Sequence, residues 1–178
     1  IASQTIRSAP TPADFREAFE ARLQALSRAH DLLVRTQWEG AELGSILAEA
    51  FRPYGPDRVV TKGPAVTLPA REALAVSLVV HELATNAAKY GGLSTPGGRL
   101  SVTWRVVRGH AGPQLELTWS ERGGPRLAGP PERKGFGSRL IERSIGRDLG
   151  GRQEADFAPE GLTCRITIPI PPVARNAG

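Results

Sequence analysis

The spacing of apolar residues predicts a long amphipathic helix near the start of the chain. Between Asp14 and Gln37, apolar positions return every three or four residues, which places them on one side of a helix. The predicted stripe consists of Phe15, Phe19, Leu23, Leu26, His30 and Leu33. Alternating steps of three and four are typical of the seam of a helical hairpin or coiled coil. We therefore expect this helix to pack lengthwise against another helix.

The rest of the chain predicts helices covering one side of a sheet. Three further helices are expected, at Ala41–Phe51, from Pro69 to about Tyr90, and at Ser138–Leu149. Strands are expected at Arg58–Thr61, Ala65–Leu68, Leu100–Val106, Leu115–Trp119 and Leu162–Ile168. The third and fourth strands alternate with period two and are joined by Arg108–Pro113, so they should form an antiparallel hairpin. This order predicts an α+β fold with helices on one face of a mostly antiparallel sheet.

Composition narrows the class of protein. The single cysteine excludes a disulfide framework, and three histidines leave little for a metal cluster. No apolar run approaches the roughly 20 residues that span a bilayer, and no signal peptide opens the chain. These features favour a cytoplasmic protein without a membrane segment. The net charge of +5 is spread among interleaved acids, so we do not expect nucleic-acid binding.

The first residues suggest a fragment of a longer protein. The sequence contains no methionine, not even at position 1. Prolines at 10 and 12 indicate a loop just before Asp14. Residues Ile1–Arg7 would then be the end of a preceding helix.

One run of polar residues suggests a nucleotide site. On the long helix, Glu82, Asn86, Lys89 and Tyr90 fall within about a third of the circumference. A carboxylate and an amide oxygen suit Mg²⁺, a lysine neutralises phosphate, and an aromatic ring packs on a base. The preceding turns are apolar on nearly all sides, which predicts a buried helix whose polar groups need partners.

A long segment without helical or strand period follows the hairpin. Residues Arg122–Gly137 are rich in glycine, proline and charge. A loop of this length inside a compact domain is typically a functional lid or disordered.

Four stretches, in order, resemble the HWE family of histidine kinases. The run His81–Ser94 resembles the N box, and Trp119-Ser-Glu121 followed by Gly123 and Gly124 resembles the next box. That family is named after the N-box histidine and the Trp-x-Glu. Gly135–Ile141 resembles the box that closes the ATP lid, and Gly161–Cys164 the last nucleotide-facing strand. Upstream residues resemble the second dimerisation helix, so the resemblance covers almost the whole chain.

The resemblance implies a Bergerat (GHKL) ATP-binding sandwich preceded by a dimerisation-type helix. It divides the chain into a partial dimerisation hairpin (1–37), a catalytic domain (38–171) and a tail (172–178). The implied cofactors are ATP and Mg²⁺, with Asn86 and Glu82 toward the metal and Glu82, His81 and Asn86 as catalytic residues. The implied ATP-binding residues are Asn86, Lys89, Tyr90, Glu121, Gly123, Gly124, Arg133, Lys134, Gly135, Phe136, Gly137, Ser138, Leu140 and Thr163.

Some of these assignments have alternatives in the residues themselves. His81 is either a site residue or a core histidine, and Arg133 and Lys134 either touch phosphate or are solvated. Glu121 would accept a hydrogen bond from the adenine amine, where most histidine kinases have aspartate. Trp119 is expected in the core, with Trp104 as its cross-strand neighbour.

The function implied by the resemblance is the ATP-binding portion of a two-component sensor histidine kinase. The γ-phosphoryl of ATP would pass to a histidine and then to an aspartate of a response-regulator receiver domain. The family's His-Arg-x-Lys-Asn acceptor stretch does not occur here, and His30 does not match an acceptor position, so the acceptor is expected upstream. Homodimerisation through 14–37 is possible. The alternative is an ATP-binding module or ATPase of the same fold without histidine phosphotransfer.

Overall fold

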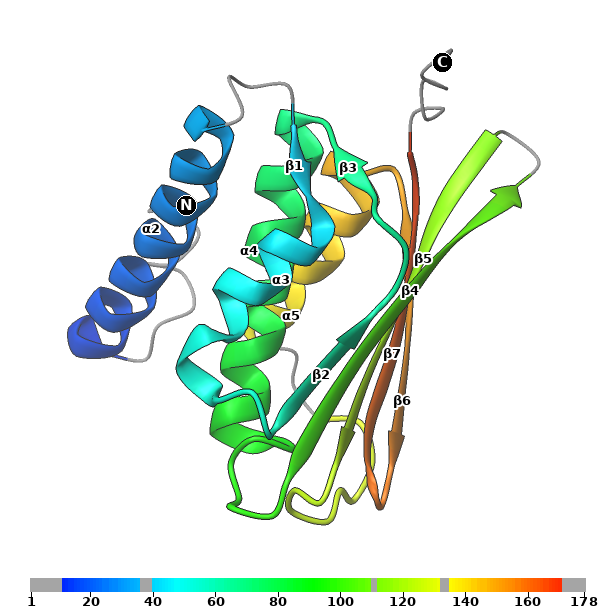
Figure 1. Cartoon of the computed structure of the whole chain (residues 1–178). Coiled ribbons are helices and arrows are strands. Elements are labelled where there is room, and N and C mark those ends of the chain that lie inside the picture. Colours follow the sequence, from blue (N-terminus) through cyan, green and yellow to red (C-terminus); the bar gives the residue numbers. More distant parts are fainter. Residues whose placement is uncertain (1–10, 36–39, 110–111, 132–134, 171–178) are drawn as a thin grey trace.

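Helices cover one face of a five-stranded sheet (Figure 1). The computed structural model describes residues 11–35, 40–109, 112–131 and 135–170. The main helices are α2 (Pro12–Arg35), α3 (Leu43–Phe51), α4 (Ala70–Tyr90) and α5 (Phe136–Arg143), with short helical turns η1 (Arg52–Tyr54) and η2 (Ser144–Asp148). The strands are β1 (Ala41–Glu42), β2 (Val59–Lys62), β3 (Thr67–Leu68), β4 (Arg99–Gly109), β5 (Gly112–Arg122), β6 (Arg152–Ala158) and β7 (Gly161–Pro169).

The sheet is mixed and mostly antiparallel, as the sequence predicts. Its strand order is β2-β4-β5-β7-β6, and only the β2–β4 pair is parallel. Strands β1 and β3 form a separate small antiparallel ladder. The α+β class and the Bergerat-type arrangement of helices on one sheet face are therefore confirmed.

The β4–β5 hairpin supplies the centre of the core. Trp119 is fully buried, and its ring lies 5.7 Å from that of Phe51 between centroids. The predicted pairing of the two tryptophans is wrong by two positions, because Trp119 pairs with Val102 and Trp104 with Leu117. The register instead places Trp119 beneath α3, which Phe51 terminates.

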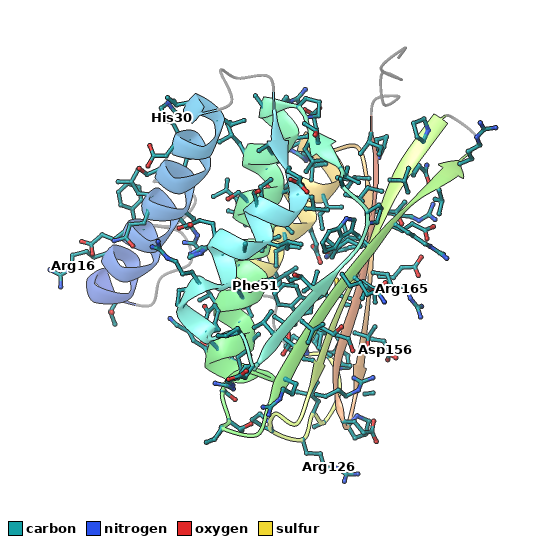
Figure 2. The ribbon with its side chains drawn as sticks, in the orientation of Figure 1. Arg16, His30, Phe51, Arg126, Asp156 and Arg165 are labelled. Carbon is teal, nitrogen blue, oxygen red and sulfur yellow. The ribbon has the colours of Figure 1, made fainter. Side chains whose placement is uncertain are left out.

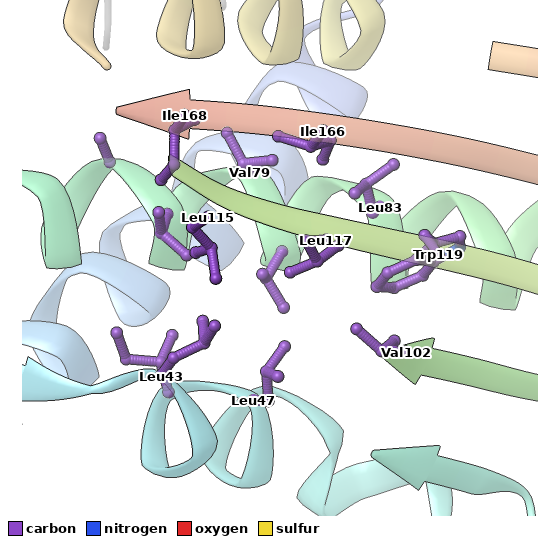
Figure 3. Close-up of a cluster of buried hydrophobic side chains, with 14 of the residues drawn as sticks. Leu43, Leu47, Val79, Leu83, Val102, Leu115, Leu117, Trp119, Ile166 and Ile168 are labelled. Atoms are coloured by element: carbon purple, nitrogen blue, oxygen red, sulfur yellow. The ribbon is translucent and has the colours of Figure 1, made fainter. Parts of the chain in front are cut away.

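Helix α4 lies between the sheet and the other helices and is buried over most of its surface. Nine of its residues are buried, Glu82 among them. Figure 3 shows Val79 and Leu83 of α4 beside side chains from β5 and β7, with Leu43 and Leu47 of α3 nearby. An apolar helix enclosed in this way holds its polar residues in fixed positions.

Helix α2 packs beside α4, and only part of the predicted stripe is buried (Figure 1). Leu23 is 53% exposed and His30 is exposed, whereas Arg22, Ala25 and Leu33 are buried. Leu33 and the half-buried Phe19 and Leu26 belong to the predicted stripe, whereas the buried Arg22 and Ala25 do not. The burial of Arg22 has a chemical reason, because a carboxylate on α4 provides its partner.

Several elements differ from the predicted ones. The first two residues of the helix predicted at Ala41–Phe51 form strand β1, and the helix begins at Leu43. Strand β6 was not expected, because its residues Arg152–Ala158 are mostly exposed and lack an apolar alternation. It is an edge strand held by pairing with β7. The helix predicted from Ser138 begins at Phe136, and its last turn (η2) is π-helical.

Leu47→Ala is expected to reduce the free energy of unfolding by about 2–5 kcal/mol, because Leu47 is fully buried in the core. Chemical denaturation of the purified chain measures this loss. Val60→Ala on the edge strand β2, where the side chain is 59% exposed, serves as the control and should cost below about 1 kcal/mol. Equal losses for the two variants would contradict the assigned core.

Candidate functional site

Two predicted site residues on α4 meet the start of α5. Asn86 follows Glu82 by about one helical turn, so both side chains emerge on the same face. A Cβ built on Gly137 would lie 2.8 Å from Glu82 Oε2 and 3.6 Å from Asn86 Nδ2. The glycine thus lets the start of α5 approach the two polar side chains closely. The N box and the lid box, 51 residues apart between Asn86 and Gly137, form one locality.

The Glu82 carboxylate is held by an arginine from α2. Arg22 Nε lies 2.7 Å from Oε1, and Arg22 Nη2 lies 3.1 Å from Oε2. Each side chain of the pair is only 7% exposed. A guanidinium fork on a carboxylate is the strongest neutralising arrangement a protein side chain offers. Sequence reasoning missed Arg22, because no motif marks it.

The second predicted acid, Glu121, ends strand β5 beneath the C-terminus of α4. Its Oε2 accepts the backbone N–H of Gly92 at 2.7 Å, and its Oε1 accepts the indole N–H of Trp119 at 2.8 Å. Glu121 is 3% exposed, and this burial raises the pKa of its carboxyl, although the two hydrogen bonds act in the opposite direction. The Trp-x-Glu motif is therefore a hydrogen-bonded unit, because residues two apart share one face of a strand.

Glycines allow the loop after α4 to close on the end of β5. A Cβ at Gly91 would collide with the Glu121 carboxylate, and one at Gly124 would lie 2.6 Å from the carbonyl oxygen of Gly91. Gly123 has φ +72°, a conformation that glycine adopts at little cost. Its carbonyl accepts the hydroxyl of Thr95 at 2.6 Å. Close backbone packing explains why this box needs two glycines.

Strand β7 runs beside the same end of β5. Thr163 pairs with Ser120, the residue before Glu121. Burial, and then the charge of Glu121, raise the pKa of the neighbouring Cys164 to about 11. The thiol is therefore protonated near neutral pH and unreactive.

The remaining predicted residues that the structure describes lie on α4 or around the start of α5. Lys89 and Tyr90 end α4, and Tyr90 is 70% exposed. His81 is half-buried and has an interaction partner. In the predicted lid box, Gly135 is exposed, Ser138 is half-buried and Leu140 of α5 is buried. Arg133 and Lys134 lie outside the described residues, as does the side chain of Phe136.

The structure thus forms two clusters joined by α4. One contains Glu82, Asn86 and Gly137, and the other contains Glu121 with the glycines. The predicted site residue Thr163 does not join it, because its partner Ser120 faces the opposite side of the sheet from Glu121. A hollow of about 770 Å³ lies elsewhere, over the sheet face opposite the helices, and is lined by side chains such as Arg105, Glu116 and Arg165. It contains none of the predicted site residues.

The residues present fit a metal that takes few protein ligands. Within the described ranges, no group of three or more His, Cys, Asp or Glu residues forms a metal cluster. Mg²⁺ binds through one or two protein oxygens together with phosphate and water. The half-buried Asn86 amide suits this role, whereas Glu82 is occupied by Arg22.

The fold is that of histidine kinase catalytic domains. The structure matches the histidine kinase domain of Erythrobacter litoralis EL346, a blue-light activated histidine kinase, with a TM-score of 0.63 and 22% identity over 85% of this chain and 74% of that one. It also matches the histidine kinase ThkA in complex with the response regulator protein TrrA, with a TM-score of 0.56 and 14% identity over 86% of this chain and 49% of that one.

Comparison of the sequence with known proteins points to a narrower group of histidine kinases. Residues 1–65 match the model of the HWE histidine kinases. The chain is also 36% identical, over 97% of its length, to the blue-light-activated histidine kinase of Brucella ovis. Both sequence comparisons therefore find similarity to histidine kinases, and the family model that matches is that of the HWE histidine kinases. The chain spans about a third of the length of such relatives, 36% in the Brucella ovis protein.

Trp119→Phe is expected to lower the free energy of unfolding more at pH 8 than at pH 5. The variant loses the donor to Glu121 Oε1, and an unsatisfied buried acceptor costs about 1–3 kcal/mol. Losing this hydrogen bond raises the folded-state pKa of Glu121 further. The folded state then binds more protons than the unfolded state, so stability falls as the pH rises through this range.

Urea denaturation at the two pH values measures the difference. The control is Trp104→Phe, whose indole N–H donates to the neutral carbonyl of Pro64 at 2.8 Å. Its loss should not depend on pH. A pH-independent loss in Trp119→Phe would contradict the role of the indole as partner of the Glu121 carboxylate.

Proposed function

We propose that the chain is the ATP-binding catalytic portion of a two-component sensor histidine kinase, which transfers the γ-phosphoryl of Mg·ATP to a histidine. The observation that carries this proposal is the meeting of Glu82 and Asn86 with Gly137 at the start of α5. The match to the HWE histidine kinase model and the catalytic-domain fold support the same activity. None of the three histidines here lies in the family's acceptor stretch, so the acceptor belongs to another part of the whole protein.

In this proposal, the N-box residues hold the metal and phosphates. The Asn86 amide oxygen binds Mg²⁺, and Glu82 orients a water of the metal's shell. Lys89, next to the exposed end of α4, neutralises phosphate charge. The metal supplies charge neutralisation for a transfer in which the protein chiefly positions groups.

In this proposal, the adenine base is bound at Glu121 and the paired glycines. A carboxylate selects adenine because it accepts a hydrogen bond from an exocyclic amine, whereas guanine presents a carbonyl at that position. Each Glu121 oxygen already accepts one internal hydrogen bond, and a carboxylate offers about four acceptor sites in all. At 3% exposure the remaining sites are covered, so adenine reaches Glu121 only when the loops beside it separate.

The partners follow from the proposed chemistry. The phosphoryl group would pass from the histidine to an aspartate of a response-regulator receiver domain, the class of partner present in the ThkA complex. The described residues contain no helix long and apolar enough to cross a bilayer. We propose a cytoplasmic location, where ATP is available. Homodimerisation through 14–37 stays a prediction.

Asn86→Ala is expected to weaken Mg·ATP binding about 10- to 100-fold, because the variant removes the metal's amide ligand. Isothermal titration calorimetry with ATP and GTP, with and without Mg²⁺, measures the effect. The unmodified chain should prefer ATP and require Mg²⁺ for its full affinity. Ser77→Ala, another small polar truncation on α4, is the control and should leave affinity unchanged.

Two results would count against the proposal. ATP affinity that is indifferent both to Mg²⁺ and to Asn86→Ala would rule out the assigned site. Steady release of ADP by the whole protein without phosphohistidine would favour an ATPase of the same fold.

A further inference from the structure

Arg22 connects α2 to the centre of the proposed phosphoryl-transfer site. It lies 60 residues before Glu82, and its guanidinium contacts both carboxylate oxygens. Both side chains are removed from water, so the pair is shielded from screening by salt. The contact is part of the packing of α2 against α4, which lie side by side in Figure 1.

The paired carboxylate has little room for another ligand. The start of α5 presses on it, since a Cβ at Gly137 would lie 2.8 Å from Oε2. Glu82 as a whole is 5% exposed. A hydrated Mg²⁺ keeps several waters and needs space for them. The guanidinium fork and the metal's water shell therefore compete for one carboxylate.

Apolar side chains of α2 accompany Arg22 in the packing against α4. Among the α2 residues whose side chains are described, those that are buried are Arg22, Ala25 and Leu33. Leu23 and Val34 are 53% and 51% exposed. Among the described side chains of α2, Arg22 is the buried charged one, so the ion pair is the contact through which α2 reaches the Glu82 carboxylate.

Taking the proposed function as its basis, we infer that Arg22 is a latch through which docked α2 keeps Glu82 from serving Mg·ATP. Displacement of α2 withdraws the guanidinium and frees the carboxylate. Linkage makes the effect reciprocal, so binding of Mg·ATP weakens the docking of α2 by the same factor. Arg22 acts through Glu82 and is a positioning residue rather than a catalytic one.

The first test compares Mg·ATP affinity in arginine variants. Arg22→Gln should bind Mg·ATP about 5- to 150-fold more tightly than the unmodified chain, the usual range of coupling between two sites. Arg22→Lys, which retains the charge but not the fork, should lie between them. The matched control is Arg16→Gln, because Arg16 is an exposed arginine of the same helix (Figure 2).

A second variant loosens α2 without altering the ion pair. Leu33→Ser places a hydroxyl at a fully buried apolar position of α2, about three turns from Arg22. It should raise Mg·ATP affinity in the same direction as Arg22→Gln. A role of Arg22 confined to stability would lower the melting temperature of the variants and leave the Mg²⁺-dependent part of the affinity unchanged.

Docking itself is measured by the distance between two spin labels. Cysteines replace the exposed Glu20 on α2 and Asp156 on β6, and the native thiol of Cys164 is buried with a pKa of about 11, so it stays unlabelled. The distance distribution should be narrow without nucleotide. It should become broader or longer with Mg·ATP, and with Arg22→Gln even in the absence of nucleotide.

The outcomes separate the latch from the function on which it rests. If the unmodified chain binds Mg·ATP, and Arg22→Gln and Leu33→Ser bind it equally or less tightly, the latch is wrong and the proposed function stands. If neither the unmodified chain nor any variant binds Mg·ATP, the proposed function fails and the latch with it. Label distances unchanged in Arg22→Gln would also overturn the latch.

Discussion

The enclosure of α4 determines how this site is built. Helix α4 packs against the sheet on one side and against α2, α3 and α5 on the others, so its middle has little surface left for water. Each polar side chain it carries must therefore meet a partner from a neighbouring element, because an unpaired buried charge is costly. Glu82 meets Arg22 from α2. At the end of the helix, the backbone N–H of Gly92 meets the Glu121 carboxylate from β5.

These contacts make α4 the common support of both clusters. The same helix contacts α2 through Glu82, the start of α5 beside Glu82 and Asn86, and the end of β5 through the loop that follows Tyr90. A shift of α4 relative to the sheet would disturb both clusters together, the one at Glu82 and Asn86 and the one at Glu121. The site is consequently sensitive to elements that never touch a nucleotide, such as α2.

Much of the fold and part of the site were predictable from the sequence. Strict alternation in β4 and β5 specified the hairpin, and the apolar run in α4 specified a buried helix, because both patterns record which face is removed from water. The proximity of Glu82 and Asn86 follows from helical spacing alone. Strand β6 was not predictable, because its position is set by pairing with β7 while its side chains remain largely exposed. The Trp119–Glu121 hydrogen bond could have been predicted, because residues two apart share one face of a strand. The register that pairs Trp119 with Val102 could not, because it depends on where the hairpin turns.

Arg22 illustrates what local patterns omit. On α2, the period of apolar residues correctly marks Leu33 as buried, but it also includes the exposed Leu23 and omits the buried Arg22. A helix buries an arginine only when a distant partner accepts it, and that partner lies far along the chain. Replacing a buried ion pair by apolar side chains is often neutral or stabilising, so the Arg22–Glu82 pair is not explained by stability alone. What distinguishes an ion pair from apolar packing is that each member can exchange its partner for another ion. At Glu82 such a contact would couple the position of α2 to the occupancy of the site, because the enclosed carboxylate has little room for a second cationic partner beside Arg22.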